Sequence, residues 1–276
     1  MTIAEALLQG TQLLEAESIA VPRLTAEVLL AHALRQDRTW LYAHGNDELH
    51  RIGWIHYGRY LHERLKGKPT QYITGRQEFY GREFRVTPAV LIPRPETEHL
   101  IEAAVKRVRP GDSIVDVGTG SGAIAITAAL ETKARVLATD ISGEALQVAR
   151  ANAKRLAALV DFIRCDLLSC LAPASMDAIL SNPPYVPRTD EATLQREVRD
   201  WEPHVALFAG DTGMEMYARI IAEATRVLRP GGSIIFELGY TAAGPVTAML
   251  DAQWENVELI PDLAGIPRVL VARFTP

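Results

Sequence analysis

The feature that most constrains the fold is an alternation of two hydrophobic patterns from residue 113 onward. Short apolar runs typical of β-strands alternate with longer amphipathic segments typical of α-helices. This order predicts a mostly parallel sheet with helices on both faces. The expected strands span residues 113–117, 135–139, 160–164, 176–181, 233–238, 257–260 and 268–274, and the expected helices span 121–131, 143–156, 213–228 and 241–251. Only residues 261–267 separate the last two strands, so these should form an antiparallel hairpin that completes a seven-stranded, Rossmann-like α/β sheet.

The first 75 residues have a different pattern, in which leucines recur at helical intervals. The pattern predicts a small bundle with helices at residues 3–17, 22–34 and 47–65. From residue 66 to residue 98, glycines and prolines separate short apolar pieces such as 84–86 and 90–92. These pieces predict a β-hairpin followed by a helix that opens near Pro95. We therefore expect three parts: a helical domain at 1–75, a hairpin linker at 76–98 and an α/β domain at 99–276.

Composition sets broad limits on function. The chain has 276 residues, 48% of them hydrophobic and 23% charged, as in an ordinary soluble globular protein. A net charge of −5, with no basic arm in the first 75 residues, argues against a protein that binds nucleic acid directly. No apolar run approaches the roughly 20 residues of a membrane span, and the N-terminus lacks the basic start of a signal peptide. We expect a cytoplasmic protein without membrane contact, and Cys165 and Cys170 as free thiols rather than metal ligands.

A tetrapeptide, Asn182-Pro183-Pro184-Tyr185, directly follows the expected strand at 176–181. Open α/β sheets bind ligands at the carboxyl ends of their strands. Proline has no N–H, so the backbone at Pro183 and Pro184 offers only carbonyl acceptors. Together with the Asn182 side-chain oxygen and the Tyr185 ring, these carbonyls suit a planar –NH₂ group. An enzyme that methylates such a nitrogen must hold a group of this kind.

The nitrogen of an amide or aromatic amine is a poor nucleophile because its lone pair is delocalised. The Asn182 oxygen and the Pro183 carbonyl could accept both N–H bonds, orient the nitrogen and stabilise the positive charge that grows on it. Tyr185 would stack on the planar group, and alignment for in-line displacement would supply the remaining acceleration. Asn182, Pro183 and Tyr185 are therefore the candidate catalytic residues, and Pro184 is a further candidate substrate contact.

A glycine-rich stretch, Gly118-Thr119-Gly120-Ser121-Gly122, follows the first expected strand and opens the first helix of the α/β region. Its glycines let the backbone approach a ligand closely. The stretch also satisfies the dinucleotide-binding pattern, so alone it leaves NAD and S-adenosylmethionine open. Asp140 ends the second strand, where it can accept hydrogen bonds from ribose hydroxyls, and Asp166 ends the third, where it can accept from an adenine amino group. The tetrapeptide favours S-adenosylmethionine, because nicotinamide chemistry does not need it.

Several longer motifs resemble those of a known family, the protein-(glutamine-N5) methyltransferases of the HemK/PrmC type, which modify peptide chain release factors. The motifs span almost the whole chain: Gly67-x-Pro69-x-x-Tyr72-x-x-Gly75, Glu78-Phe79-Tyr80-Gly81, Leu91-Ile92-Pro93-Arg94-Pro95-Glu96-Thr97-Glu98, Asp116 to Gly122, Asn182 to Tyr185, Glu202-Pro203 with Ala206-Leu207, and Asp262-x-x-Gly265-x-x-Arg268. The stretch from Leu91 to Glu98 is the most specific of them.

The resemblance implies a class I methyltransferase core, a helical domain that helps dock the substrate, and S-adenosyl-L-methionine as cofactor. It implies that the substrate is the glutamine of the Gly-Gly-Gln motif in class I peptide chain release factors. Carried over, the cofactor residues are Gly118, Thr119, Gly120, Ser121, Gly122, Asp140, Asp166, Leu167 and Asn182, and the glutamine-binding residues are Asn182, Pro183, Pro184 and Tyr185. Leu167 stands where some members have an aromatic residue, so adenine packing is expected to be aliphatic.

Three residues near these motifs have open roles. Arg94 and Glu96 could contact the substrate loop or cap the following helix, and Glu237 could support the tetrapeptide from behind. Three rival functions also stand beside the main interpretation. A DNA adenine N6-methyltransferase would hold a flipped base with the same tetrapeptide. The others are a catalytically idle binding module and a methyltransferase for a ribosomal protein glutamine.

Overall fold

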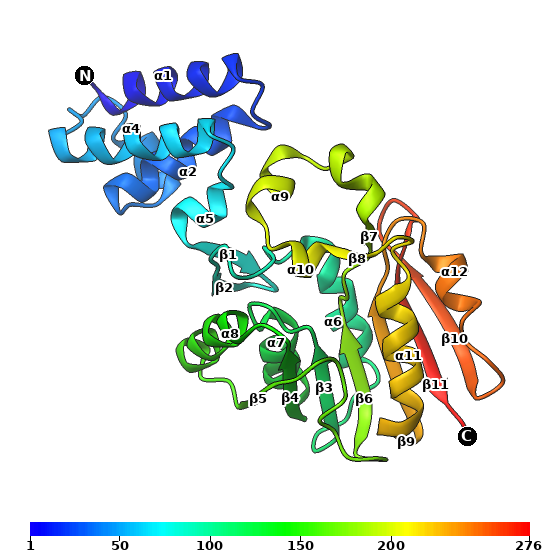
Figure 1. Ribbon diagram of the computed structural model, residues 1–276. Coiled ribbons are helices and arrows are strands. Elements are labelled where there is room, and N and C mark those ends of the chain that lie inside the picture. Colours follow the sequence, from blue (N-terminus) through cyan, green and yellow to red (C-terminus); the bar gives the residue numbers. More distant parts are fainter. The chain divides into compact units, whose positions relative to one another are not determined.

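A computed structural model describes residues 1–276. The chain forms two compact units (Figure 1). The first comprises residues 1–76 and 195–201, and the second comprises residues 77–194 and 202–276. The chain therefore enters the first unit twice. The first crossing lies one residue beyond the predicted helical domain, whereas nothing in the sequence indicates the return of residues 195–201.

The first unit is helical. Its elements are α1 (Ile3–Ala16), α2 (Pro22–Leu34), α3 (Arg38–Ala43), α4 (Arg51–Leu65), α5 (Thr70–Thr74) and α9 (Arg196–Trp201). Leu14, Leu29, Leu30 and Tyr57 are fully buried and form the centre of its core. The predicted bundle is thus present, with two short helices, α3 and α5, that the leucine spacing does not indicate.

The predicted helix at 47–65 is too long at its start. Helix α4 begins at Arg51, and His50 is its N-cap, where Nδ1 accepts a hydrogen bond from the Gly53 N–H at 2.9 Å. The preceding residues are held in an extended conformation, because the Leu49 N–H donates to the Met1 carbonyl at 3.0 Å. Backbone pairing with the N-terminus therefore overrides the helical pattern of this segment.

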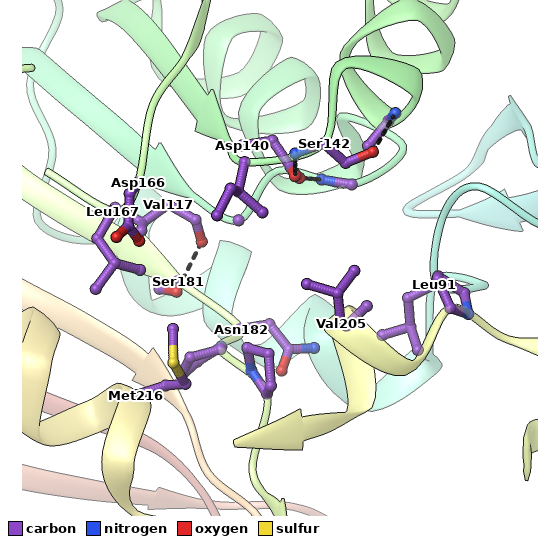
Figure 2. Close-up of a pocket in the computed structure, with 18 of the residues that line it drawn as sticks. Leu91, Val117, Asp140, Ser142, Asp166, Leu167, Ser181, Asn182, Val205 and Met216 are labelled. Atoms are coloured by element: carbon purple, nitrogen blue, oxygen red, sulfur yellow. Dashed lines mark hydrogen bonds between the residues drawn. The ribbon is translucent and has the colours of Figure 1, made fainter. Parts of the chain in front are cut away.

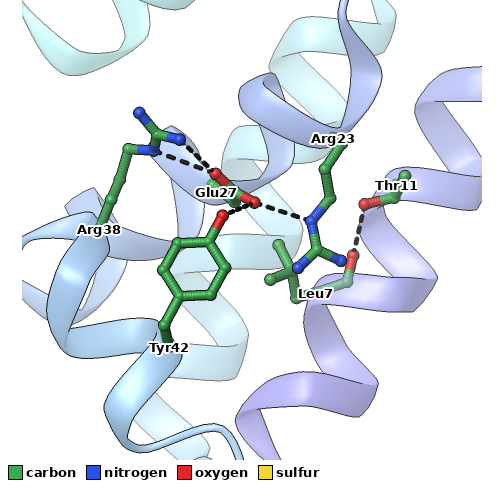
Figure 3. Close-up of polar contacts among 6 residues, drawn as sticks. All are labelled: Leu7, Thr11, Arg23, Glu27, Arg38 and Tyr42. Atoms are coloured by element: carbon green, nitrogen blue, oxygen red, sulfur yellow. Dashed lines mark hydrogen bonds and ion pairs between the residues drawn. The ribbon is translucent and has the colours of Figure 1, made fainter.

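A buried carboxylate ties α2 to α3 (Figure 3). The Glu27 side chain is 2% exposed, and it accepts hydrogen bonds from Arg23 at 2.7 Å, Arg38 at 2.7 Å and the Tyr42 hydroxyl at 2.6 Å. Burial acts to raise the pKa of Glu27, but the three hydrogen bonds outweigh it and lower the pKa. The carboxylate therefore stays charged and joins two helices through its partners.

The returning segment, α9, is also held by charge. Arg64 of α4 is almost buried and pairs with Glu197 at 2.5 Å. The Lys68 ammonium lies 5.9 Å from the centre of the Trp201 ring, within cation–π range. These contacts make α9 an integral part of the helical unit, although it follows the tetrapeptide in sequence.

The predicted β-hairpin is present but lies earlier than the apolar pieces suggest. It consists of β1 (Arg76–Phe79) and β2 (Arg82–Arg85), followed by the 3₁₀ turn η1 (Pro95–Thr97) and α6 (Glu98–Val105). Residues 90–92 form no strand; Val90 and Ile92 are buried in irregular chain. The helix start near Pro95 is correctly predicted, because proline is favoured in the first turn.

The second unit is built on a seven-stranded sheet, and the predicted α/β fold is confirmed. The strands are β3 (Ser113–Val117), β4 (Arg135–Asp140), β5 (Val160–Arg164), β6 (Met176–Ser181), β9 (Leu228–Glu237), β10 (Trp254–Pro261) and β11 (Pro267–Phe274). They lie in the order β10-β11-β9-β6-β3-β4-β5. β11 runs antiparallel to both neighbours, and all other pairings are parallel. The predicted closing hairpin is β10 with β11.

Helices cover both faces of the sheet (Figure 1). On one face lie α6, α7 (Ala123–Thr132) and α8 (Gly143–Leu156), and on the other lie α11 (Glu215–Val227) and α12 (Ala243–Thr247). Neighbouring residues of β3 serve opposite faces: Ile114 packs in the first layer and Val115 in the second. Burial on both sides explains why the central strands read as continuous apolar runs.

The remaining elements lie between β6 and α11. They are β7 (Val186–Pro187), η2 (Arg188–Thr193), α10 (His204–Leu207) and β8 (Phe208–Gly210), with β7 and β8 paired in parallel. The sequence predictions contain none of them, because each is too short to show a period. Not one helix of the chain combines the length and the apolar character that a membrane span requires.

Candidate active site

A cavity of about 250 Å³ lies in the second unit at the carboxyl ends of β3, β4 and β6 (Figure 2). From β3 the chain continues outward on one side to β4 and β5, and then returns to form β6 on the other side of β3. The cavity therefore occupies the point where the strand order reverses. Crevices at such points are where open α/β sheets bind ligands.

The glycine-rich loop forms one wall of the cavity through Gly118 and Gly120. Both have positive φ, 74° and 54°, and a Cβ added at either would meet no atom within 4 Å. Bare backbone is thus exposed to a ligand at these positions. Of the other loop residues predicted to bind the cofactor, Thr119, Ser121 and Gly122 are buried beneath the surface and do not line the cavity.

The loop is held from below by Asp116, which is fully buried at the carboxyl end of β3. One carboxylate oxygen accepts from the Thr119 hydroxyl at 2.6 Å and from the Ala125 N–H at 3.2 Å. The other oxygen has no partner. Burial raises the pKa of Asp116 to about 7, against the lowering effect of the two hydrogen bonds. Asp116 supports the loop, and Thr119 acts in this support rather than in the cavity.

Asp140 ends β4 and lines the cavity. Its two oxygens accept backbone hydrogen bonds, one from Gly120 and one from Ser142, each at 2.9 Å (Figure 2). Burial raises its pKa, although these N–H groups act in the opposite direction. Each oxygen keeps a second lone pair, so the carboxylate can still accept from a ligand hydroxyl.

Asp166 and Leu167 line the cavity beyond the end of β5. One oxygen of Asp166 pairs with Arg219 of α11 at 2.8 Å, and both side chains are about half exposed. Leu167 is buried, and its backbone has a positive φ of 50°. The site predicted for an adenine ring is thus aliphatic at this residue. Arg219 is a neighbour that the sequence does not reveal.

Three residues of the tetrapeptide line the cavity, and the fourth, Tyr185, does not. Asn182, Pro183 and Pro184 line the cavity, and Figure 2 shows Asn182 across it from Asp140. The ring of Tyr185 packs instead toward Gly239, where an added Cβ would lie 2.8 Å from Tyr185 Cδ2. Burial raises the pKa of Tyr185 to about 12, so its hydroxyl stays neutral. The predicted stacking role of Tyr185 therefore stays a prediction, while the other three residues border the space where a ligand fits.

A further wall comes from the segments around Leu91 and Val205 (Figure 2). Arg94 holds these segments together, since it donates to the buried Glu202 carboxylate at 2.5 Å. The Ile92 N–H also donates to Glu202, at 3.4 Å. Arg94 makes no side-chain cap for η1, so the capping role considered for it is not observed.

Sequence reasoning gives no role to several residues of the lining. Leu91, Val205, Met216 and Ile220 make it largely apolar. Leu91 belongs to the Leu91–Glu98 motif, but the motif gives Leu91 itself no role. Met216 and Ile220 lie one helical turn apart on α11. That spacing indicates a buried face but not the cavity that it borders.

Two family models match the chain. The first, described as the PrmC N-terminal domain, matches residues 5–75. The second, described as the methyltransferase small domain, matches residues 95–199. The first match coincides with the helical region of unit one, and the second spans the glycine-rich loop and the tetrapeptide.

Solved structures of low sequence identity share the fold of the second unit. A methyltransferase from Pyrococcus furiosus is 20% identical, with a TM-score of 0.54 over 71% of this chain and 90% of that one. A 16S rRNA methyltransferase from T. thermophilus, solved with AdoMet and guanosine, is 18% identical, with a TM-score of 0.54 over 72% of this chain and 49% of that one. At these identities the likeness concerns the fold alone.

Full-length relatives are far more similar. Proteins named release factor glutamine methyltransferase share 47% identity in Koribacter versatilis, over 99% of both chains, and 43% in Nitratidesulfovibrio vulgaris, over 99% of this chain and 95% of the other. A third, from Moorella thermoacetica, shares 40% over 99% and 98%. The resemblance found in the motifs is confirmed, and this chain belongs to the release factor glutamine methyltransferase family.

Proposed function

We propose that this chain transfers a methyl group from S-adenosyl-L-methionine to the side-chain amide nitrogen, N5, of the glutamine in the Gly-Gly-Gln motif of class I peptide chain release factors. The modification would support translation termination, in the cytoplasm and without direct binding of nucleic acid. One observation carries the proposal: Asn182, Pro183 and Pro184 line the same cavity as Gly118 and Asp140. The names of the full-length relatives supply the substrate.

The cavity fits the cofactor in its chemical groups. Gly118 and Gly120 present backbone without side chains, which suits close approach by the amino-acid portion. Asp140 would accept from the ribose hydroxyls, and Asp166 with Leu167 would flank the adenine. When bound, S-adenosyl-L-methionine supplies an electrophilic methyl group on a sulfonium sulfur.

The protein's own contribution at the substrate end is orientation. The Asn182 side-chain oxygen and the Pro183 carbonyl would accept the two N–H bonds of the glutamine amide. Both acceptors also favour the positive charge that develops on nitrogen as the new bond forms. The apolar lining, including Pro184 and Met216, excludes water and so strengthens these interactions. No covalent enzyme intermediate is required.

The proposal is tested by incubating the protein with labelled methyl donor and three acceptors: a class I release factor, duplex DNA and ribosomal protein. Mass spectrometry should locate one added methylene mass on the Gly-Gly-Gln glutamine. A release factor with that glutamine changed to alanine is the matched control and should remain unlabelled. Label on DNA alone, or on ribosomal protein alone, would show that the substrate is wrong.

The helical unit is proposed to dock the release factor. Its surface exposes three apolar side chains within one turn of α4: Ile52 is 66% exposed, Ile55 57% and Trp54 37%. The substitution Ile55→Glu should raise the KM for release factor severalfold and leave cofactor affinity unchanged. Leu159→Glu, at a 91% exposed leucine of the second unit, is the control. An equal effect of both substitutions would contradict docking on α4.

A further inference from the structure

Behind the tetrapeptide lies a chain of three hydrogen-bonded side chains from distant parts of the second unit. The Asn182 amide nitrogen, Nδ2, lies 3.3 Å from Thr97 Oγ1, and the Thr97 hydroxyl donates to Glu237 Oε2 at 2.5 Å. Thr97 is 4% exposed and Glu237 3%. The three residues come from the end of β6, from η1 and from the end of β9. Thr97 and Glu237 are buried, whereas Asn182 is partly exposed at the cavity. The buried hydroxyl and carboxylate therefore find hydrogen-bond partners within this chain of side chains.

The direction of these hydrogen bonds fixes the Asn182 side chain. A threonine hydroxyl has one hydrogen to donate, and here the hydrogen is used on the Glu237 carboxylate. Thr97 Oγ1 can then only accept, and the group that donates to it is the amide –NH₂ of Asn182. One N–H of Nδ2 is used on Thr97, which turns the nitrogen end of the amide toward Thr97. The acceptor Oδ1 is then the end left for a ligand that donates hydrogen bonds.

We infer that Thr97 and Glu237 are positioning residues that hold Asn182 with its oxygen available to the substrate nitrogen. The inference rests on the proposed function for the identity of that nitrogen. A rotated Asn182 would present –NH₂ to the –NH₂ of a glutamine, donor against donor. Neither Thr97 nor Glu237 lines the cavity, so both act through Asn182.

Glu237 is fixed at the end of β9 by its backbone and its surroundings. The Tyr217 hydroxyl donates to the Glu237 carbonyl at 2.8 Å, and the Gly239 N–H donates to that hydroxyl at 3.3 Å. The charged or titratable groups that act on Glu237 are Glu96, Arg94, Arg268, Tyr185 and Tyr217. Burial raises the pKa of Glu237 to about 7, against the lowering effects of Thr97, Arg268 and Arg94.

Protonation of Glu237 would undo the arrangement. A neutral Glu237 can donate its own O–H to Thr97 Oγ1, which frees the Thr97 hydrogen to donate to Asn182 Oδ1. The asparagine amide would then rest in the rotated orientation. The charged form of Glu237 is therefore the one that keeps Asn182 correctly turned.

The first test compares Thr97→Val, which keeps the shape and removes the hydroxyl, with Thr97→Ser, which keeps the hydroxyl. With release factor as substrate, Thr97→Val should lower kcat by about ten- to a hundredfold. The Kd for S-adenosyl-L-methionine should change less than twofold. Thr97→Ser should retain most of kcat. Equal kcat in the valine variant and the wild type would overturn the inference, and so would an equal loss in both variants.

The second test uses the pH profile. In the wild type, kcat should rise as pH increases through about 7, the pKa of Glu237, and in Glu237→Gln this limb should be absent. A purely structural role would lower stability without removing the limb. Persistence of the same limb in Glu237→Gln would count against the inference.

A third measurement needs no substrate and so separates this inference from the proposed function. The Asn182 side-chain –NH₂ resonances, assigned by their loss in Asn182→Asp, should shift in Thr97→Val and exchange faster with water. Thr97→Ser should leave them in place. If the wild type methylates no release factor but the resonances respond as expected, the substrate is wrong and the positioning role stands. Resonances unchanged in Thr97→Val would refute the positioning role.

Discussion

Two side chains at the carboxyl ends of β4 and β6, the strands on either side of β3, face the same cavity but are held in different ways: they are Asp140 and Asn182. Asp140 is held by backbone N–H groups of Gly120 and Ser142, at the tips of loops in its immediate vicinity. Asn182 is held by Thr97, 85 residues away in sequence, and through it by Glu237. The first arrangement depends on main-chain geometry. The second depends on the identity of distant side chains.

The difference separates the two halves of the cavity functionally. Backbone groups present the same donors whatever the side chains are. The cofactor half of the cavity, around Asp140, should therefore tolerate changes in the neighbouring side chains better than the substrate half, around Asn182. The hydrogen-bonded chain of Asn182, Thr97 and Glu237 fails when any one member loses its donor or acceptor group. We therefore expect substitutions to divide cleanly into those that weaken cofactor binding and those that lower turnover.

The largest effect is expected for Asn182→Ala. This change removes the acceptor that the substrate nitrogen needs and should lower kcat by about 100- to 1000-fold. The Kd for S-adenosyl-L-methionine, measured by calorimetry, should stay within about threefold. A large loss of cofactor affinity would show that the two halves are not separate.

A smaller effect, in the opposite half, is expected for Asp140→Asn. The amide cannot offer acceptors on both sides to Gly120 and Ser142, and it carries no charge. Hydrogen bonds to charged groups contribute about 1.5–3 kcal/mol, so the cofactor Kd should rise by roughly ten- to a hundredfold. Glu144→Gln, an exposed change in the first turn of α8, is the control. Unaltered affinity in Asp140→Asn would leave the cofactor assignment without its main support.

A stability effect is expected from Asp116, beneath the loop that both halves share. Its pKa is raised from 3.8 to about 7, so the folded protein binds this proton more tightly than the unfolded chain does. The contribution to stability is fully present below pH 3.8 and is lost as pH rises through 7. Asp116→Asn should flatten the fall in unfolding free energy over this window, measured by urea titration. Asp161→Asn, at an exposed position, should keep the wild-type slope.

The smallest effect is expected for Gly239→Ala. The added Cβ would lie 2.8 Å from Tyr185 Cδ2, so the ring must shift to accommodate it. We expect a loss of about 1 kcal/mol in stability and a few-fold loss in kcat, with cofactor affinity unchanged. Gly244→Ala, where a Cβ meets nothing within 4 Å, is the control. A Gly239→Ala variant with normal kcat would argue that Tyr185 does not take part in turnover.

Much of the second unit could be predicted because its central strands are buried on both faces. β3, β5 and β6 match the predicted bounds to the residue. β5 lies at the edge of the sheet and is largely exposed, so its match does not come from burial. Segment 90–92 has the same apolar appearance yet forms no strand. Val90 and Ile92 fill the core without a pairing partner, and a local pattern cannot distinguish the two cases.

The predictable part of the site is likewise its local part. The glycine-rich loop directly follows β3, and Asp140 is the last residue of β4, so position in the sequence already places them at the cavity. The roles of Thr97, Glu202 and Arg219 depend on contacts with residues tens of positions away. No periodicity connects Thr97 to Asn182, and only the folded chain brings them together.

Because α9 belongs to the helical unit, the helical and catalytic units cannot be separated by a single cut in the chain. A cut after residue 76 does not release an independent module, because Glu197 and Trp201 would lose Arg64 and Lys68 while remaining attached to the catalytic polypeptide. Conversely, a fragment ending at residue 76 would leave the Arg64 guanidinium without its counter-charge, Glu197. The helical unit is thus complete only with residues 195–201, which lie within the sequence of the catalytic unit. Exchanging the helical unit between homologues would require moving residues 1–76 and 195–201 together.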